Sequence, residues 1–189
     1  EIVTQKRSLK VNLRRLIMSQ PEALLWKNLK QSLPSHWQHQ RIENRAGGGV
    51  PDVFMCAEGI SWWVELKIGK TSAIKVSAFQ HAWNYAHHRA GGSSFYLVSP
   101  LEGPNLYLFA GDQGKNLMTH GIKSNGSGPV VPCLWSGSGF GDLVPRMLSI
   151  ARERLSKYMI ESSWVGVGDQ SGSGSGLDDS GRGNSGLDS

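Results

Sequence analysis

The stretch over residues 49–68, GVPDVFMCAEGISWWVELKI, decides the fold. Its two apolar runs, Pro51 to Ala57 and Ser61 to Ile68, flank the turn signal Glu58-Gly59. Short runs rich in Val, Trp and Phe on either side of such a turn are typical of paired strands. The sequence therefore predicts an antiparallel hairpin here.

Three polar side chains of this hairpin come together. Side chains alternate along a strand, so Glu65 and Lys67 should project from one face, roughly 6–7 Å apart, while Leu66 points into the core. Asp52, at the start of the neighbouring strand, can lie beside them. Two close carboxylates repel each other unless a cation lies between them, and oxygen ligands suit Mg²⁺, with Mn²⁺ as a substitute. A nearby lysine can orient a water or offset charge on a phosphate, so the pattern indicates metal-assisted phosphodiester hydrolysis.

The segments around the hairpin predict a mixed α/β layer. Helical spacing covers Val11 to Leu33, with a break and new N-terminus at Ser19 to Glu22, and Pro34 ends it. Further elements are expected as a strand in Trp37–Arg45, a helix over Ser77–Arg89, strands at Ser94–Val98 and Asn105–Phe109, a loop over Gly121–Gly141, and a last helix over Asp142–Ile160. The buried faces of the two later helices are expected to be formed by Phe79, Ala82, Trp83 and Ala86, and by Leu143, Met147, Ile150, Leu155 and Met159.

The charge divides unevenly along the chain. Residues 166–189 hold four aspartates and one arginine, a net charge of −3, so the remainder of this +5 chain carries +8. A basic body favours a polyanion such as nucleic acid, although a solubilising surface is the plain alternative. We expect one domain over residues 1–165 and a disordered Gly/Ser/Asp-rich tail over 166–189.

The composition also bears on compartment. There is no apolar run of eighteen residues, and the first twenty residues contain five Lys/Arg without the apolar core of a signal peptide, so neither a membrane span nor export is expected. The two cysteines, Cys56 and Cys133, form no CxxC or Cys/His cluster, which disfavours zinc and disulfides. These features favour a reducing cytoplasm, that of a bacterium or a phage-infected host.

Pro51-Asp52 and Glu65-Leu-Lys67 together resemble the signature of the PD-(D/E)XK nucleases, most closely archaeal Holliday-junction resolvases and related phage and VRR-NUC nucleases. The resemblance covers roughly residues 21–109. It implies a restriction-endonuclease-like core of order α-β-β-β-α-β and a metal-dependent DNA endonuclease. It also implies that Asp52, Glu65 and the Leu66 carbonyl bind Mg²⁺, that the 3′-oxygen leaves, and that a homodimer cuts branched DNA.

The resemblance also implies a third acid, for which two candidates remain open. Glu22 has the expected placement on the first helix but is also a good capping-box residue, and Glu43 precedes the glycines but also suits an exposed strand. Gln80 is either a site-facing amide or a plain helix-surface residue. Candidate phosphate contacts, for which solvated surface positions are the alternative, are Arg14, Arg15, Arg41, Arg45, Lys70 and Lys75.

Two competing functions stay open on the sequence. One is a phage-type, homing or nicking endonuclease with the same site acting on linear duplex DNA. The other is a non-catalytic nucleic-acid-binding module in which the motif is coincidental. Acids among buried aromatic residues speak against a plain binder of an anionic ligand.

Overall fold

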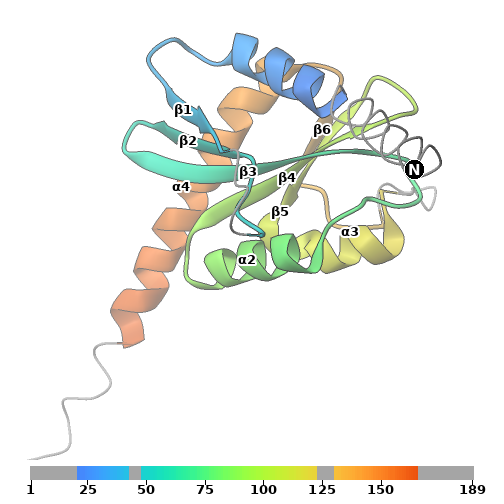
Figure 1. Ribbon diagram of the computed structural model, residues 1–189. Helices are drawn as coiled ribbons and strands as arrows, with labels where there is room; N and C mark the ends of the chain where they lie inside the picture. Colours follow the sequence, from blue (N-terminus) through green and yellow to red (C-terminus); the bar gives the residue numbers. More distant parts are fainter. Residues whose placement is uncertain (1–20, 43–47, 123–129, 166–189) are drawn as a thin grey trace, which may run out of the picture.

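The computed structural model describes residues 21–42, 48–122 and 130–165 (Figure 1). Six strands form one mixed sheet in which spatial order follows chain order, β1 to β6. The strands are β1 (Gln38–Arg41), β2 (Val53–Ala57), β3 (Ile60–Gly69), β4 (Ser93–Pro100), β5 (Leu106–Ala110) and β6 (Trp135–Gly137). The helices are one over residues 21–32, α2 (Ala78–Arg89), the short 3₁₀ turn η1 (Gly111–Gln113), α3 (Gly114–His120) and α4 (Phe140–Val165).

The β2–β3 hairpin closes through a two-residue turn. Ala57 pairs with Ile60, and the residues between them, Glu58 and Gly59, both have positive φ, 53° and 75°. Positive φ at both central residues is the geometry whose twist matches that of the flanking strands. The turn thereby fixes the register, in which Val53 lies opposite Val64, and it determines which residues meet at the far end of the hairpin.

The sheet contains one parallel pair of strands. All neighbouring strands are antiparallel except β3 and β4, which pair in parallel from Trp62↔Ser93 to Gly69↔Pro100. A parallel pair needs a crossover, and α2 provides it. The N-terminus of α2 therefore lies near the carboxyl end of β3, the strand that carries Glu65 and Lys67.

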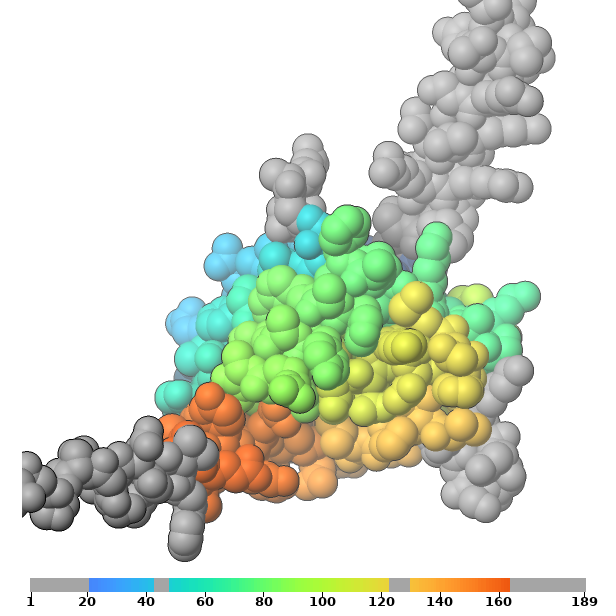
Figure 2. Space-filling view, turned by 90° about the horizontal axis from the view of Figure 1, so that it is seen from below, coloured from blue at the N-terminus to red at the C-terminus, as the bar shows by residue number. Residues whose placement is uncertain are grey.

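Helices cover both faces of the sheet (Figure 1). The helix over residues 21–32 and α4 lie on one face, where their apolar residues join those of the strands in the larger core, with Leu29, Leu66 and Met147 at its centre. α2 and α3 lie on the other face, where a smaller core contains Tyr96, Phe109 and Leu117. Figure 2 looks onto that second face, on which α2 and α3 are neighbours.

The expected α/β class is confirmed, with the α-β-β-β-α-β order of a restriction-endonuclease-like core and a mixed sheet flanked by helices. The first helix ends before Pro34, as predicted. Its expected portion before Pro21 and the proposed tail over residues 166–189 lie outside the described residues. No helix in the described part of the chain is long and apolar enough to cross a bilayer.

Several local predictions are wrong. The segment Gly121–Gly141 was expected to be a loop throughout but contains β6, whose three residues pair with β5. On α2, Phe79, Ala82 and Ala86 are exposed, and the fully buried residue is Asn84. On α4, Leu155 and Met159 are exposed because this 26-residue helix, about 39 Å long at 1.5 Å per residue, extends past the sheet (Figure 1).

Candidate active site

The site begins where β2 and β3 separate. Their pairing ends at Val53↔Val64, and Asp52 is the residue directly before β2. The Leu66 backbone N–H donates to Asp52 Oδ2 at 2.8 Å, so the Asp52 side chain replaces the missing strand partner. The Asp52 carbonyl in turn accepts from the Ile42 N–H at 2.7 Å. Asp52 is thus fixed by backbone groups on both sides.

Glu65 and Lys67 lie on the sheet face that α2 covers, as the alternation predicts. Lys67 Nζ is 2.8 Å from Glu65 Oε1, and the two residues are 8% and 0% exposed. Leu66, between them, points into the opposite core. A buried carboxyl group thus lies beside a buried ammonium and close to Asp52.

The Gln80 side chain connects this ion pair to α2. Its Nε2 donates to Glu65 Oε1, while its Oε1 accepts from Lys67 Nζ at 3.1 Å and from the Ser77 N–H at 3.0 Å. Ser77 is the N-cap of α2, and its hydroxyl accepts from the Gln80 N–H at 3.1 Å, which completes a capping box. The amide therefore faces the site, and the cap that starts the helix also fixes its position.

Three further residues, which the sequence did not mark as functional, hold Gln80 in place. Ser77 holds its oxygen, as described above. Asn84 Nδ2 donates to the Gln80 carbonyl at 2.9 Å, and the Tyr96 hydroxyl lies 3.4 Å from the same oxygen. Both Asn84 and Tyr96 are fully buried. The Ser-x-x-Gln pattern at residues 77–80 was a readable signal of the capping box; the two buried residues left no comparable sequence signal.

Burial dominates the electrostatics of the acids. Burial, and after it the Asp52 charge, raise the pKa of Glu65 to about 8, although Lys67 acts in the opposite direction. Burial also raises the pKa of Asp52, against the Leu66 N–H, Lys67 and Arg41, which lower it. Without a further cation, the two carboxyls do not share two negative charges readily at neutral pH.

Glu22 and Arg41 belong to the same electrostatic group. Burial raises the pKa of Glu22; Lys67 opposes this shift, Asp52 adds to it and Arg41 opposes it. Glu22, half-buried on the first helix, therefore lies close enough to affect the acids at the site.

The other predicted residues divide into two groups. Lys70 and Lys75 are exposed on the connection between β3 and α2, whose last residue, Ser77, contacts the Gln80 amide. Four predicted residues lie outside the described part of the chain: Glu43, Arg45, Arg14 and Arg15. The choice between Glu22 and Glu43 is therefore not decided by their placement.

The donor set fits a hard divalent cation. Glu65 Oε2 is buried, and no donor among the described residues bonds to it; a cation, or a proton shared with the neighbouring Asp52, would satisfy it. The N–H and C=O of one strand residue point to the same side, so the Leu66 carbonyl shares the edge that its N–H offers to Asp52. Within the described ranges no three His, Cys, Asp or Glu side chains group closely enough to hold a metal. A cation would therefore depend on two carboxylates, a carbonyl and water, as Mg²⁺ often does.

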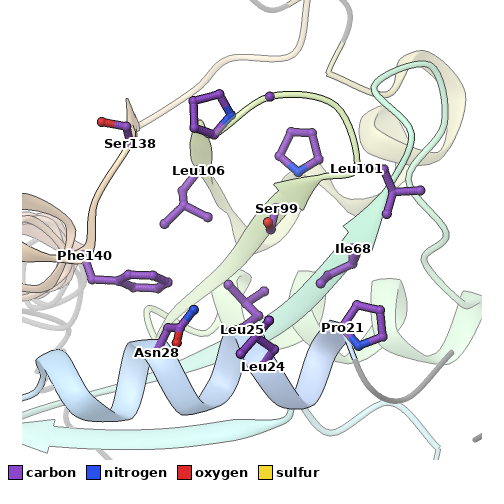
Figure 3. Close-up of a pocket in the computed structure, with 13 residues that line it drawn as sticks. Pro21, Leu24, Leu25, Asn28, Ile68, Ser99, Leu101, Leu106, Ser138 and Phe140 are labelled. Atoms are coloured by element: carbon purple, nitrogen blue, oxygen red, sulfur yellow. The ribbon is translucent and has the colours of Figure 1, made fainter. Parts of the chain in front are cut away.

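A separate pocket of about 390 Å³, lined by both polar and apolar residues, lies between the first helix and the ends of β3 and β4 (Figure 3). Leu24 and Leu25 of the first helix, Ile68 of β3 and Phe140 of α4 contribute to its lining. Neither Asp52, Glu65 nor Lys67 lines it. The candidate active-site residues and this pocket are therefore separate features.

No protein-family model matches the chain, and no sequence match to a curated protein is found. Among solved structures, the chain is similar to Hjc of Archaeoglobus fulgidus, described as a Holliday junction resolvase from an archaeal hyperthermophile. The TM-score is 0.34 and the identity 11%, over 51% of this chain and 75% of that one. These values describe a partial and distant likeness.

Proposed function

We propose that this chain is a metal-dependent endonuclease that hydrolyses phosphodiester bonds in DNA. The observation that carries the proposal is the buried cluster at the end of the β2–β3 hairpin. There Asp52 is held by backbone groups, and Glu65 keeps one oxygen without a partner beside the Lys67 ammonium. Buried acids of this kind are costly to the metal-free protein, which favours a functional role for them.

Asp52, Glu65 and the Leu66 carbonyl would hold Mg²⁺, with Glu22 or Glu43 contacting it through water. Such a cation supplies Lewis-acid polarisation of the phosphate and lowers the pKa of bound water. The chain supplies the rest. Lys67 has three N–H donors, of which Glu65 and Gln80 accept two, which leaves one for the attacking water or a phosphate oxygen. Gln80 keeps Lys67 and Glu65 in place while this occurs.

The reaction adds one water across one bond. The water oxygen attacks phosphorus on the side opposite the 3′-oxygen, the bond from phosphorus to the 3′-oxygen breaks, and that oxygen takes a proton. The products are a 3′-hydroxyl and a 5′-phosphate. The positive charge of Lys67 offsets the negative charge that grows on the phosphoryl oxygens. Arg41, Lys70 and Lys75 would contact neighbouring phosphates and set register rather than sequence.

Branched DNA is the proposed substrate, on the strength of the motif resemblance. Symmetric cutting of a junction requires two sites, and we propose a homodimer. The exposed end of α4 offers a surface for it, since Leu155, Tyr158 and Met159 lie at helical spacing and are 39%, 41% and 61% exposed.

A cleavage assay separates the candidate functions. Purified protein is incubated with a labelled four-way junction, a linear duplex of the same arm sequence and a single strand, each with Mg²⁺ or EDTA. Glu65→Ala is compared with Glu161→Ala, a control at an exposed position on α4.

Paired symmetric cuts in the junction, lost with EDTA and in Glu65→Ala only, are the expected result. Equal cutting of all three substrates would keep the nuclease and reject the junction preference. Binding without metal-dependent cutting of any substrate would favour a nucleic-acid-binding module.

A further inference from the structure

Phe79 is the most exposed large hydrophobic side chain among the described residues, at 71%. It lies in the first turn of α2, directly before Gln80. A single exposed apolar side chain is common on protein surfaces and needs no explanation by itself. Its position one residue from the amide that joins Glu65 and Lys67 is what makes it informative.

Two glycines hold Phe79 against the approach to Asp52. A Cβ on Gly48 would lie 3.2 Å from Phe79 Cγ, so the ring contacts the backbone there. Gly49 has φ +104°, and a Cβ on it would lie 2.4 Å from the Phe79 carbonyl oxygen. The glycines thus let the chain cross the first turn of α2 closely, three residues before Asp52. The ring therefore contacts the segment that leads to Asp52, and most of its surface is open to solvent.

The charge around this ring is also suited to a nucleotide. The first turn of α2 contains no acidic residue. The connection that leads into it carries the exposed Lys70 and Lys75, and its Thr71 N–H donates to the exposed Glu102. An aromatic face beside cations that track a phosphate backbone is the arrangement that binds unstacked bases.

We propose that Phe79 stacks on an unpaired nucleobase next to the scissile phosphate, and so selects DNA in which a base is already unstacked: a fork, flap or branch point. The inference rests on the proposed function and names its substrate class. In an intact duplex both faces of a base are covered by its neighbours, and the ring has nothing to stack on. In a fork the first unpaired base exposes one face, and Phe79 covers it; in a four-way junction a branch-point base pair must open before the ring can stack.

Binding in EDTA tests this without cleavage. The probes are a forked duplex with 2-aminopurine at the first unpaired position and a blunt duplex of the same sequence. The full chain is compared as wild type, Phe79→Ala and Phe79→Trp. Tyr85→Ala is the matched control because Tyr85 is an exposed aromatic residue on the same helix, further from the site.

Phe79→Ala should weaken binding of the fork by between about 5-fold and about 150-fold, change binding of the blunt duplex by less than about 2-fold, and abolish quenching of 2-aminopurine. Phe79→Trp should restore all three. Tyr85→Ala should match wild type. Equal weakening of both DNAs by Phe79→Ala, or weakening of neither, would overturn the inference.

Cleavage with Mg²⁺ separates this inference from the proposed function. If wild type cuts DNA and Phe79→Ala cuts and binds forks as wild type does, the stacking inference fails and the nuclease stands. If wild type cuts nothing while the fork preference still depends on Phe79, stacking stands and the nuclease fails. Because Phe79 is exposed, its variants should retain the melting temperature of wild type.

Discussion

Metal ions and protons should compete for the Glu65 carboxylate. Burial and the neighbouring Asp52 raise the pKa of this carboxyl to about 8. At pH 6 it is then ionised in about 1% of metal-free molecules, and at pH 8 in about half of them. Because a carboxylate must lose its proton to bind a metal, the apparent affinity for Mn²⁺ should rise about 50-fold between these two pH values. An ordinary glutamate would give a change of less than about 1.1-fold.

The assay is electron paramagnetic resonance of free Mn²⁺ during titration of the protein at pH 6, 7 and 8. Glu65→Gln should bind more weakly and lose most of the pH dependence, while the exposed control Glu161→Gln should match wild type. Calorimetry in two buffers of different ionisation enthalpy should show proton release on binding at pH 7. An Mn²⁺ affinity that stays constant from pH 6 to 8 would refute the argument that Glu65 is a protonated ligand in the metal-free protein.

Three further predictions follow from the same geometry. The folded state holds a proton on Glu65 that the unfolded state loses above about 4.5, so the Glu65 contribution to the free energy of unfolding in EDTA should fall as pH rises from about 4.5 to about 8. Denaturant titration of wild type and Glu65→Gln at several pH values isolates this contribution from that of the histidines, and Mn²⁺ should reduce the fall in wild type. Gln80→Leu removes the hydrogen bonds to Glu65, Lys67 and Ser77 and should lower the free energy of unfolding by about 1–3 kcal/mol in urea denaturation. The control Gln31→Leu, at an exposed position on the first helix, should lower it little. Equal losses in the two variants would count against the role of Gln80 in joining Glu65 and Lys67. Met159→Glu should convert a dimer to a monomer in sedimentation at an unchanged melting temperature, and identical sedimentation of variant and wild type would reject α4 as the dimer surface.

The hairpin could be predicted from the sequence because its information is local. The turn at Glu58-Gly59 fixes the register, and alternation then assigns Glu65 and Lys67 to one face and Leu66 to the other. The place of Asp52 beside them follows from that register. Alternation along the strands also gives the direction of each side chain, whatever strands lie elsewhere in the sheet.

The face of α2 could not be predicted from apolar spacing. The helix contacts the sheet through polar groups, with Gln80 bound to Glu65 and Lys67 and with Asn84 buried. At its edge it contacts the sheet through Trp83, the one predicted residue that packs, against Trp63. A site at the sheet surface therefore reversed the usual pattern and left Phe79 outside. Local spacing detects an apolar stripe but does not detect that the partner surface is polar.

Two other elements depend on contacts distant in sequence. β6 is a three-residue segment, Trp135 to Gly137, that exists because β5 offers it an edge, and its own sequence has little strand preference. The end of α4 reads as apolar, but nothing in the spacing shows where the sheet beneath it stops.

The central claim is that Asp52, Glu65 and Lys67 form a metal-dependent nuclease site. Single-turnover cleavage of a labelled fork in Mg²⁺, with enzyme above the dissociation constant of each variant, tests it most directly. Wild type should cut, leaving 5′-phosphates. Lys67→Met should bind the fork within a few-fold of wild type but cut it at least about 100-fold more slowly, because the lysine acts on the transition state. A Lys67→Met variant that cuts at the wild-type rate would contradict the claim.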